Sequence, residues 1–141
     1  MVAGFERNLA ILQNSMSANR MRSQTIANNI ANAETPHFKR SEINFEAELG
    51  RALRNEEAAR RNPPLQARQT HHLHTNFPQP RSWQQVEARR RLDYLSEVNN
   101  NGNNVDLERE AQLATMNSLS YEMLTELVNF QFRQITAVIR G

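Results

Sequence analysis

The sequence predicts a mainly α-helical protein whose long N- and C-terminal helices pair as a coiled-coil-like hairpin, with an irregular, partly extended middle segment. Apolar residues recur every three or four positions along both ends of the chain, which is the spacing of one helix face. Four of the five prolines lie between the two ends, where no sustained period is found. We therefore expect one structural unit made of an N-terminal helix (1–36), a middle segment (37–104) and a C-terminal helix (105–141).

The N-terminal helix is predicted from one apolar stripe, which a polar stretch at Asn19 and Ser23 interrupts. An amphipathic helix of about 30 residues explains this pattern. Pro36 should end the helix, because proline lacks an N–H donor and disfavours the helical conformation of the residue before it. The stripe consists of Phe5, Leu9, Leu12, Met16, Ile26 and Ile30.

The middle segment is predicted to contain one short extended piece and one helix. Residues 38–45 hold two aromatic residues and favour an extended conformation. Apolar residues at helical spacing predict a helix over about 45–61, which the prolines at 63 and 64 terminate. An irregular loop is expected from there to residue 81, and residues 83–98 are ambiguous between helix and loop.

The C-terminal helix is predicted from the longest uninterrupted periodic stretch. A turn-forming run of asparagines around Gly102 precedes it, because both residue types tolerate positive φ. Asp106 is placed to cap a helix that starts at Leu107 and runs for about 33 residues. Its apolar residues form two adjacent rows, a face wider than one partner helix needs, and this indicates oligomerisation. One row holds Leu113, Met116, Leu124, Leu127 and Ile135, and the other holds Ala111, Ala114, Tyr121, Val128, Phe132 and Ile139.

The composition favours an elongated protein whose apolar faces are buried partly between molecules. Apolar residues make up 38% of the chain, whereas an ordinary domain holds roughly 45–50%. The net charge is +2; residues 1–33 hold one acid and three arginines, and residues 105–141 hold five acids and three arginines, so the two ends attract one another weakly. The absence of cysteine excludes disulfides and thiolate metal sites. Neither a membrane span nor a cleavable secretory signal is expected.

The candidate reactive groups do not predict an enzyme, a metal site or a cofactor. The cluster of His71, His72 and His74 has no acid nearby to help complete four metal ligands, so a solvated loop is the better interpretation. The arginines at 60–61 and 89–91 could bind phosphates, but neighbouring acids favour a charged surface. No nucleophile elbow or glycine-rich phosphate loop is present, and no small-molecule substrate is expected.

Three asparagines near the end of the first helix leave two interpretations open. Asn28, Asn29 and Asn32 are poor helix residues, because their side chains compete for backbone hydrogen bonds. They can mark a fraying helix end before Pro36. Alternatively, their amides bind neighbouring chains or shape the exit from the helix.

The run 24–36 resembles the N-terminal signature of the flagellar rod, hook and hook-associated axial proteins. In that family an Ala-Asn-Asn-Ile-Ala-Asn segment leads to Thr-Pro, a glycine, an aromatic residue and a basic residue. Here Phe38 and Lys39 match the last two positions, and His37 stands in place of the glycine. Residues 103–110, followed by residues 117–121, are similar to the start of the C-terminal helix of the proximal rod proteins.

The resemblance implies a structural subunit of the flagellar basal-body proximal rod, which polymerises through its terminal helices into the drive shaft that transmits torque from motor to hook. It implies contacts with copies of itself, other rod proteins, membrane-ring and export-gate components. It also implies a place in the periplasmic rod, reached through the flagellar type III export apparatus without a cleaved signal peptide. The assembly residues expected on this basis are Leu9, Leu12, Met16, Ile26, Asn28, Asn29, Ile30, Asn32, Pro36, Phe38, Leu113, Tyr121, Leu124, Leu127 and Val128.

Three alternative functions fit parts of the sequence. The nearest is the sister proximal rod protein of the same family. A cytoplasmic helical adaptor that binds nucleic acid through its arginine clusters is a second alternative, although nucleic acid is not an expected partner of a rod protein. A metal-dependent enzyme built on the three histidines is the third.

Overall fold

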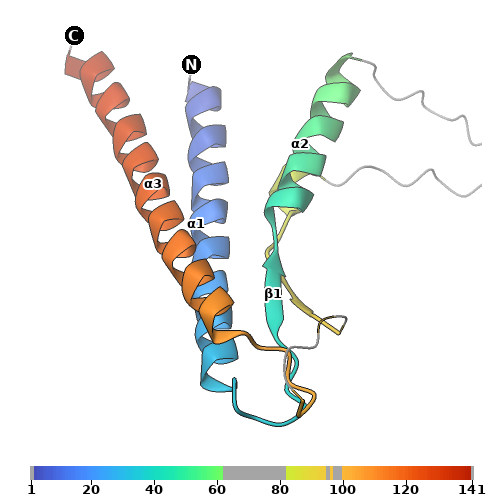
Figure 1. Ribbon diagram of the computed structural model, residues 1–141. Coiled ribbons are helices and arrows are strands. Elements are labelled where there is room, and N and C mark those ends of the chain that lie inside the picture. The colour runs from blue at the N-terminus through green and yellow to red at the C-terminus, as the bar shows by residue number, and fades with distance from the viewer. Residues whose placement is uncertain (1, 62–81, 95, 97–99, 141) are drawn as a thin grey trace, which may run out of the picture. The chain divides into compact units, whose positions relative to one another are not determined.

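The computed structural model describes residues 2–61, 82–94, 96 and 100–140. Within them the chain forms the helix α1 (Val2–Ala31), the strand β1 (Ser41–Asn44), the helix α2 (Glu46–Arg61), a 3-10 turn η1 (Trp83–Gln85), the strand β2 (Arg89–Leu92) and the helix α3 (Leu107–Arg140) (Figure 1). The predicted fold class is confirmed: the protein is mainly helical, with long terminal helices and a short, partly extended middle. None of the helices in these residues holds a stretch that is apolar enough to span a membrane.

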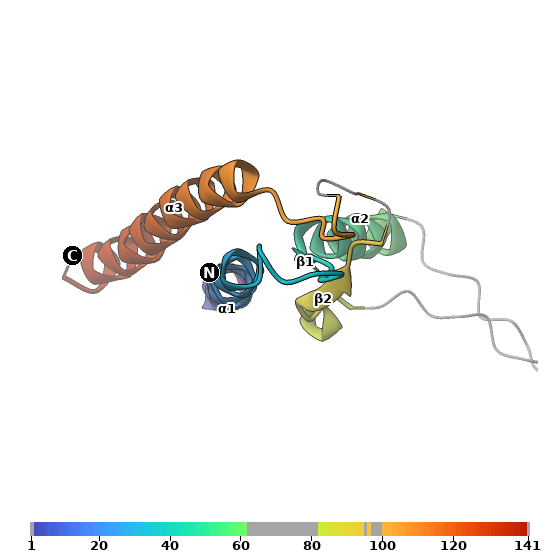
Figure 2. The same cartoon turned by 60° about the horizontal axis from the view of Figure 1, so that its bottom comes forward.

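The chain divides into two compact units. The first is Met1–Asn44 with Ala88–Gly141, and the second is Phe45–Glu87. In the first unit α1 and α3 pack side by side and antiparallel, so that the two chain ends lie at the same end of the pair (Figure 1). Figure 2 shows α3 on one side of α1 and the two strands on the other. The predicted segments 1–36, 37–104 and 105–141, taken together as one structural unit, stay a prediction.

Helix α1 has the predicted length of 30 residues but ends at Ala31, before Pro36 is reached. Residues 32–37 form turns in which the amides of Thr35 and Phe38 donate to the carbonyls of Asn32 and Thr35. His37, at the usual glycine position of the family signature, has φ of 59°. This left-handed conformation costs a residue with a Cβ more than it costs glycine.

Helix α3 begins as predicted. The Oδ1 atom of Asp106 accepts hydrogen bonds from the amides of Glu108 and Arg109, at 3.0 and 3.3 Å, and so caps the helix. Gly102, in the preceding turn, has the positive φ of 76° that the asparagine-rich run predicted.

The middle segment contains the predicted extended piece, as β1, and the predicted helix, as α2. Of the ambiguous residues 83–98, residues 83–85 form the 3-10 turn η1 and residues 89–92 pair antiparallel with β1 as strand β2, so no α-helix forms over their described part. The predicted irregular loop over residues 62–81 and its histidines lie outside the described residues. The second unit is built on a small apolar core, which consists of Phe45, Leu49, Ala52, Trp83 and Val86.

The core of the first unit is mostly polar. Its only fully buried apolar residues are Ala18, Ile26, Ile43 and Val105, as far as the structure describes the unit. The buried polar and charged residues are more numerous and include Asn19, Thr25, Asn29, Arg40, Ser41, Asn103, Asn104, Glu110 and Asn117. Because buried polar groups need partners, these residues point to the part of the molecule where specific contacts matter most.

Candidate functional site

A buried cluster, here called the polar clamp, joins α1, β1 and α3 and consists of Asn29, Arg40, Ser41, Asn104 and Glu110. Asn29 is completely buried at the end of α1. Its Nδ2 donates to the carbonyl of Ser41 at 2.8 Å, and the Ser41 amide donates to its Oδ1 at 3.0 Å. The side-chain amide thus pairs with Ser41 as the peptide group of a neighbouring strand would, and it fastens the strand to the helix.

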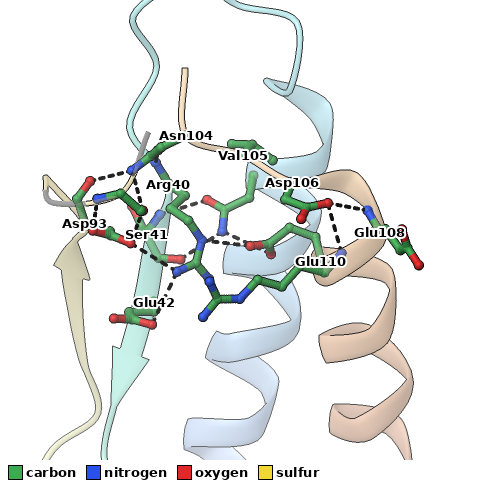
Figure 3. Close-up of polar contacts among 12 residues, drawn as sticks. Arg40, Ser41, Glu42, Asp93, Asn104, Val105, Asp106, Glu108 and Glu110 are labelled. Atoms are coloured by element: carbon green, nitrogen blue, oxygen red, sulfur yellow. Dashed lines mark hydrogen bonds and ion pairs between the residues drawn. The ribbon is translucent and has the colours of Figure 1, made fainter. Parts of the chain in front are cut away.

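An ion pair forms the centre of the polar clamp (Figure 3). The Nε atom of Arg40 donates to Glu110 at 3.0 Å, and their side chains are 4% and 0% exposed. Asn29 donates to the second Glu110 oxygen at 3.2 Å. Arg40 also contacts Glu42 and Asp93 at 3.4 and 3.5 Å. The buried guanidinium therefore meets three carboxylates, and the pair joins positions 70 residues apart in the sequence.

The guanidinium of Arg40 stays protonated in its buried position. Burial alone would lower the pKa of its guanidinium, but the hydrogen bond and the charge of Glu110 outweigh this effect, with smaller contributions from Glu42 and Asp93. The pKa of Arg40 is therefore raised above its ordinary value. The polar clamp holds a permanent cation at neutral pH.

Two successive asparagines complete the junction. Asn104 accepts a hydrogen bond from the Arg40 amide at 2.6 Å and donates to the Asp93 carbonyl at 2.7 Å, so it closes the end of the β1–β2 ladder. The Nδ2 atom of Asn103 lies 2.8 to 3.0 Å from the carbonyls of Asn32, Ala33 and Thr35. It therefore provides a donor for three carbonyls of the turn that follows α1 and fixes the path of the chain there.

Away from the polar clamp, the two terminal helices meet along a thinner seam. Asn117 donates to the carbonyl of Asn19 at 3.1 Å, while its own Oδ1 is buried without a partner among the described residues. Further along, Phe5 and Phe132 pack edge to face with ring centroids 6.1 Å apart. Figure 1 shows that α1 and α3 diverge toward the N- and C-terminal ends of the chain. No residue of α3 beyond Asn117 is fully buried in the described chain.

A second feature is an exposed apolar face on α3. Five large residues follow one another at steps of three or four positions, so they lie on one face of the helix, and each is 48% to 68% exposed. This exposed α3 face consists of Met116, Leu119, Met123, Leu127 and Phe130. Contiguous exposed apolar residues of this kind mark interaction surfaces.

The predicted assembly residues fall into three groups. Those at half-buried positions along the helix pair and the turn after α1 are Leu9, Leu12, Met16, Asn32, Phe38, Leu113, Leu124 and Val128. Those on the surface are Asn28, Ile30, Pro36, Tyr121 and Leu127, while Ile26 and Asn29 are buried within the chain. Of the three asparagines left open, Asn29 shapes the exit from the helix, Asn32 bonds locally to the carbonyl of Asn28, and Asn28 accepts from Arg90. Their role between chains stays a prediction.

Apart from Asn29, the sequence did not reveal which polar residues are most buried. Arg40 and Glu110 each lie among other charged residues, and Asn103 and Asn104 stand out only as turn formers and as part of the family resemblance. For the arginines at 60 and 61, the expected charged surface is found on α2, where Arg60 pairs with Glu56 and Arg61 pairs with Glu57. Within the described ranges no three His, Asp or Glu side chains gather as a metal site would require.

Comparison with known proteins agrees with the motifs. The family model described as "Flagella basal body rod protein" matches residues 9–39. The chain is 35% identical to the flagellar basal body rod protein FlgB of Borrelia hermsii, over 96% of this chain and 98% of that protein. It is 29% identical to the FlgB protein of Bacillus subtilis, over 97% and 96% of the two chains. The FlgB protein of Escherichia coli is 26% identical, over 94% and 93%.

These relatives decide between the two proximal rod proteins that the motifs left open, which are FlgB and its sister FlgC. Each relative named above is a FlgB protein, and each aligns over nearly its whole length. The family is one of structural rod proteins rather than enzymes. The chain therefore belongs to the family of the flagellar basal body rod protein FlgB.

Proposed function

We propose that this structural rod subunit polymerises through its terminal helices into the proximal rod, the part of the drive shaft that transmits torque from motor to hook. The observation that carries the proposal is the exposed α3 face, because it leaves five large apolar side chains in water on a helix that already packs against α1. Burial of such side chains against a neighbour contributes about 25 cal/mol per Å² of apolar surface.

Two different faces of one helix suit an open assembly. One face of α3 packs against α1 in the same chain, and the exposed α3 face is left for another subunit. A contact between two unlike surfaces repeats without closing into a dimer, and it generates a helical stack when the rotation does not close a ring. A rod needs this kind of contact.

The predicted assembly residues divide into two roles in this proposal. Exposed positions such as Ile30, Tyr121 and Leu127 contact neighbouring subunits directly. Buried positions such as Ile26 and Asn29 act within the chain, where they hold the two helices in the orientation that the contact requires. The half-buried seam residues serve both roles where the helices diverge.

The proposed neighbours are copies of this chain, other rod proteins, and the membrane-ring and export-gate components at the rod base. The names of the relatives support the basal body as the location. Placement in the periplasmic part of the rod, and delivery by the flagellar type III export apparatus, follow from the family resemblance and belong to the proposal.

A charge introduced on the exposed α3 face tests the proposal. Met123 is 68% exposed, so Met123→Glu should leave the isolated chain as helical as the parent, and it should prevent co-purification with basal bodies and abolish swimming in a complemented strain. The matched control is Ser118→Glu, which adds the same charge at an exposed α3 position away from this face. Normal swimming and normal basal bodies with Met123→Glu would refute the proposed face.

A further inference from the structure

We propose that the outer edge of β2 is a docking site for an extended acidic segment of another protein, which adds to the sheet as a third strand. The proposal concerns strands rather than the helical contacts of rod assembly, and it does not depend on them. It rests on the pairing pattern of the sheet, on the charges of β2 and on a contrast between the two sheet edges.

The register shows which peptide groups of β2 are open. Ser41 faces Leu92 and Ile43 faces Arg90, and the Asp93 amide donates to the Arg40 carbonyl at 2.9 Å. Bonded and non-bonded pairs alternate in an antiparallel ladder, so Arg90 and Leu92 occupy the non-bonded positions. Their N–H and C=O groups point away from β1, and no partner for them is found in the described residues.

The other edge of the sheet is treated differently. Ser41 also occupies a non-bonded position, and its outward N–H and C=O are both taken by the Asn29 side chain. Asn29 therefore closes the β1 edge at Ser41, whereas no side chain of the described residues plays this part at the β2 edge. An open edge is a template for pairing with another strand.

The charge of the edge determines which strand it accepts. Arg89, Arg90 and Arg91 are consecutive and exposed, and Leu92 is exposed beside them. Arg90 donates to Asn28 at 3.3 Å, whereas Arg89 and Arg91 form no ion pair within the described residues. An incoming strand with acids at alternate positions would place them opposite these two arginines, and opposite charges across strands stabilise the pair.

A second copy of this chain does not fit the edge. If two β2 strands paired, arginines would face arginines, and like charges directly opposite destabilise a sheet. The other described strand, β1, carries one acid, Glu42, which already lies against Arg40. The arginine edge thus discourages self-association and selects an acidic strand from a different protein.

An acidic peptide of alternating sequence, Thr-Glu-Val-Glu-Val-Glu-Thr with blocked ends, is the probe. Hydrogen exchange of the full chain should show at least about tenfold slower exchange of the Arg90 and Leu92 amides when the peptide is added at low salt. The Asp93 amide already donates to the Arg40 carbonyl, just before β1, and should be protected with and without the peptide. If Asp93 is unprotected in the free chain, the edge is not formed and the proposal is overturned.

Two matched controls separate strand addition from simple charge attraction. A peptide with lysine in place of glutamate should not bind, and an acidic peptide whose alternate backbone nitrogens are methylated should bind at least about tenfold more weakly, because it cannot complete the ladder. Equal binding of the methylated peptide would show a charged surface without strand pairing and would overturn the proposal.

Two variants of the chain complete the test. Leu92→Pro removes an outward N–H without removing a bond to β1, so it should weaken peptide binding and keep Asp93 protected. Arg89→Glu, at a position opposite Asn44, should weaken binding by about tenfold. Arg51→Glu makes the same charge change on the exposed side of α2 and should have little effect. If Arg51→Glu weakened binding as much as Arg89→Glu, net charge alone would govern the interaction.

Discussion

Removal of the Glu110 carboxylate should open the junction between the terminal helices and the sheet. In Glu110→Ala, Arg40 stays buried and charged but loses its closest carboxylate, at 3.0 Å, and Asn29 loses an acceptor at 3.2 Å. Both side chains are almost completely buried, so bulk water does not take the place of the lost carboxylate beside Arg40. The variant therefore leaves a buried cation poorly compensated.

The size of the effect follows from what Arg40 keeps. Removal of one partner of a buried ion pair costs about 3–5 kcal/mol. Arg40 retains Asp93 at 3.5 Å and Glu42 at 3.4 Å, and the Glu42 side chain is 54% exposed. These longer contacts compensate in part, so we expect the lower end of the range, about 3 kcal/mol. This free energy corresponds to roughly a hundredfold change in the local opening equilibrium.

The Ser41 amide reports on this opening, because it donates to Asn29 inside the polar clamp. Its protection against hydrogen exchange, measured on the native chain at neutral pH, should fall by roughly a hundredfold in Glu110→Ala. Glu110→Gln keeps the side-chain shape and an acceptor for Arg40 but lacks the charge, so it should lose less protection than the alanine variant.

Glu108→Ala is the matched control in the same helical turn. Glu108 is exposed, and its contact with Asp106 uses the backbone amide, which alanine keeps. Loss of an acid from the first turn of a helix costs about 0.3–1 kcal/mol. If Glu110→Ala and Glu108→Ala reduced Ser41 protection equally, the buried ion pair would not hold the junction.

Two further predictions concern single positions. Gly102→Ala should destabilise the chain by about 1–2 kcal/mol in urea unfolding, because Gly102 has φ of 76° and an added Cβ would lie 2.8 Å from the Nδ1 atom of His37. Gly50→Ala, inside α2, should instead stabilise the chain by about 0.5–1 kcal/mol, because an added Cβ there would meet only the flexible tip of Arg54 at 3.4 Å. If both variants were stabilised, or both destabilised, the reasoning would be contradicted. The raised pKa of Arg40 means that its contribution to stability is complete below the pKa of unfolded arginine and is lost only as the pH rises through the higher folded value. Ser41 protection, corrected for the intrinsic exchange rate, should therefore be unchanged between about pH 7 and pH 10, and a steady fall over that interval would argue against a charged Arg40 as the centre of the polar clamp.

Local sequence features predicted the elements that depend on local physics. The spacing of Leu9, Leu12 and Met16 belongs to one helix face whatever the rest of the chain does. The caps are equally local, since Asp106 bonds to amides two and three residues away. These elements could be predicted because the residues that stabilise them are close in sequence.

The polar clamp and β2 could not be predicted in this way. Glu110 meets Arg40 and Asn29, which are 70 and 81 residues away in the chain. Residues 89–92 form a strand without alternating polarity, because β1 lies opposite and Asn104 closes the ladder. Asn29 stands out in the sequence as a poor helix residue, but nothing local to it shows that it pairs with Ser41, 12 residues further along the chain.

The burial of the terminal helix pair differs along its length. Asn29, Asn103 and Glu110 are enclosed at the end next to the sheet, whereas no described residue of α1 before Ala18 is fully buried. One end is therefore specified by polar contacts within the chain, and apolar side chains of α3 are exposed toward the other end. This arrangement makes the two tests separable: Glu110→Ala should affect the fold of the single chain, and Met123→Glu should affect assembly alone. If both substitutions reduced Ser41 protection in the isolated chain, the exposed α3 face would already serve folding, and its proposed role in assembly would lose its main support.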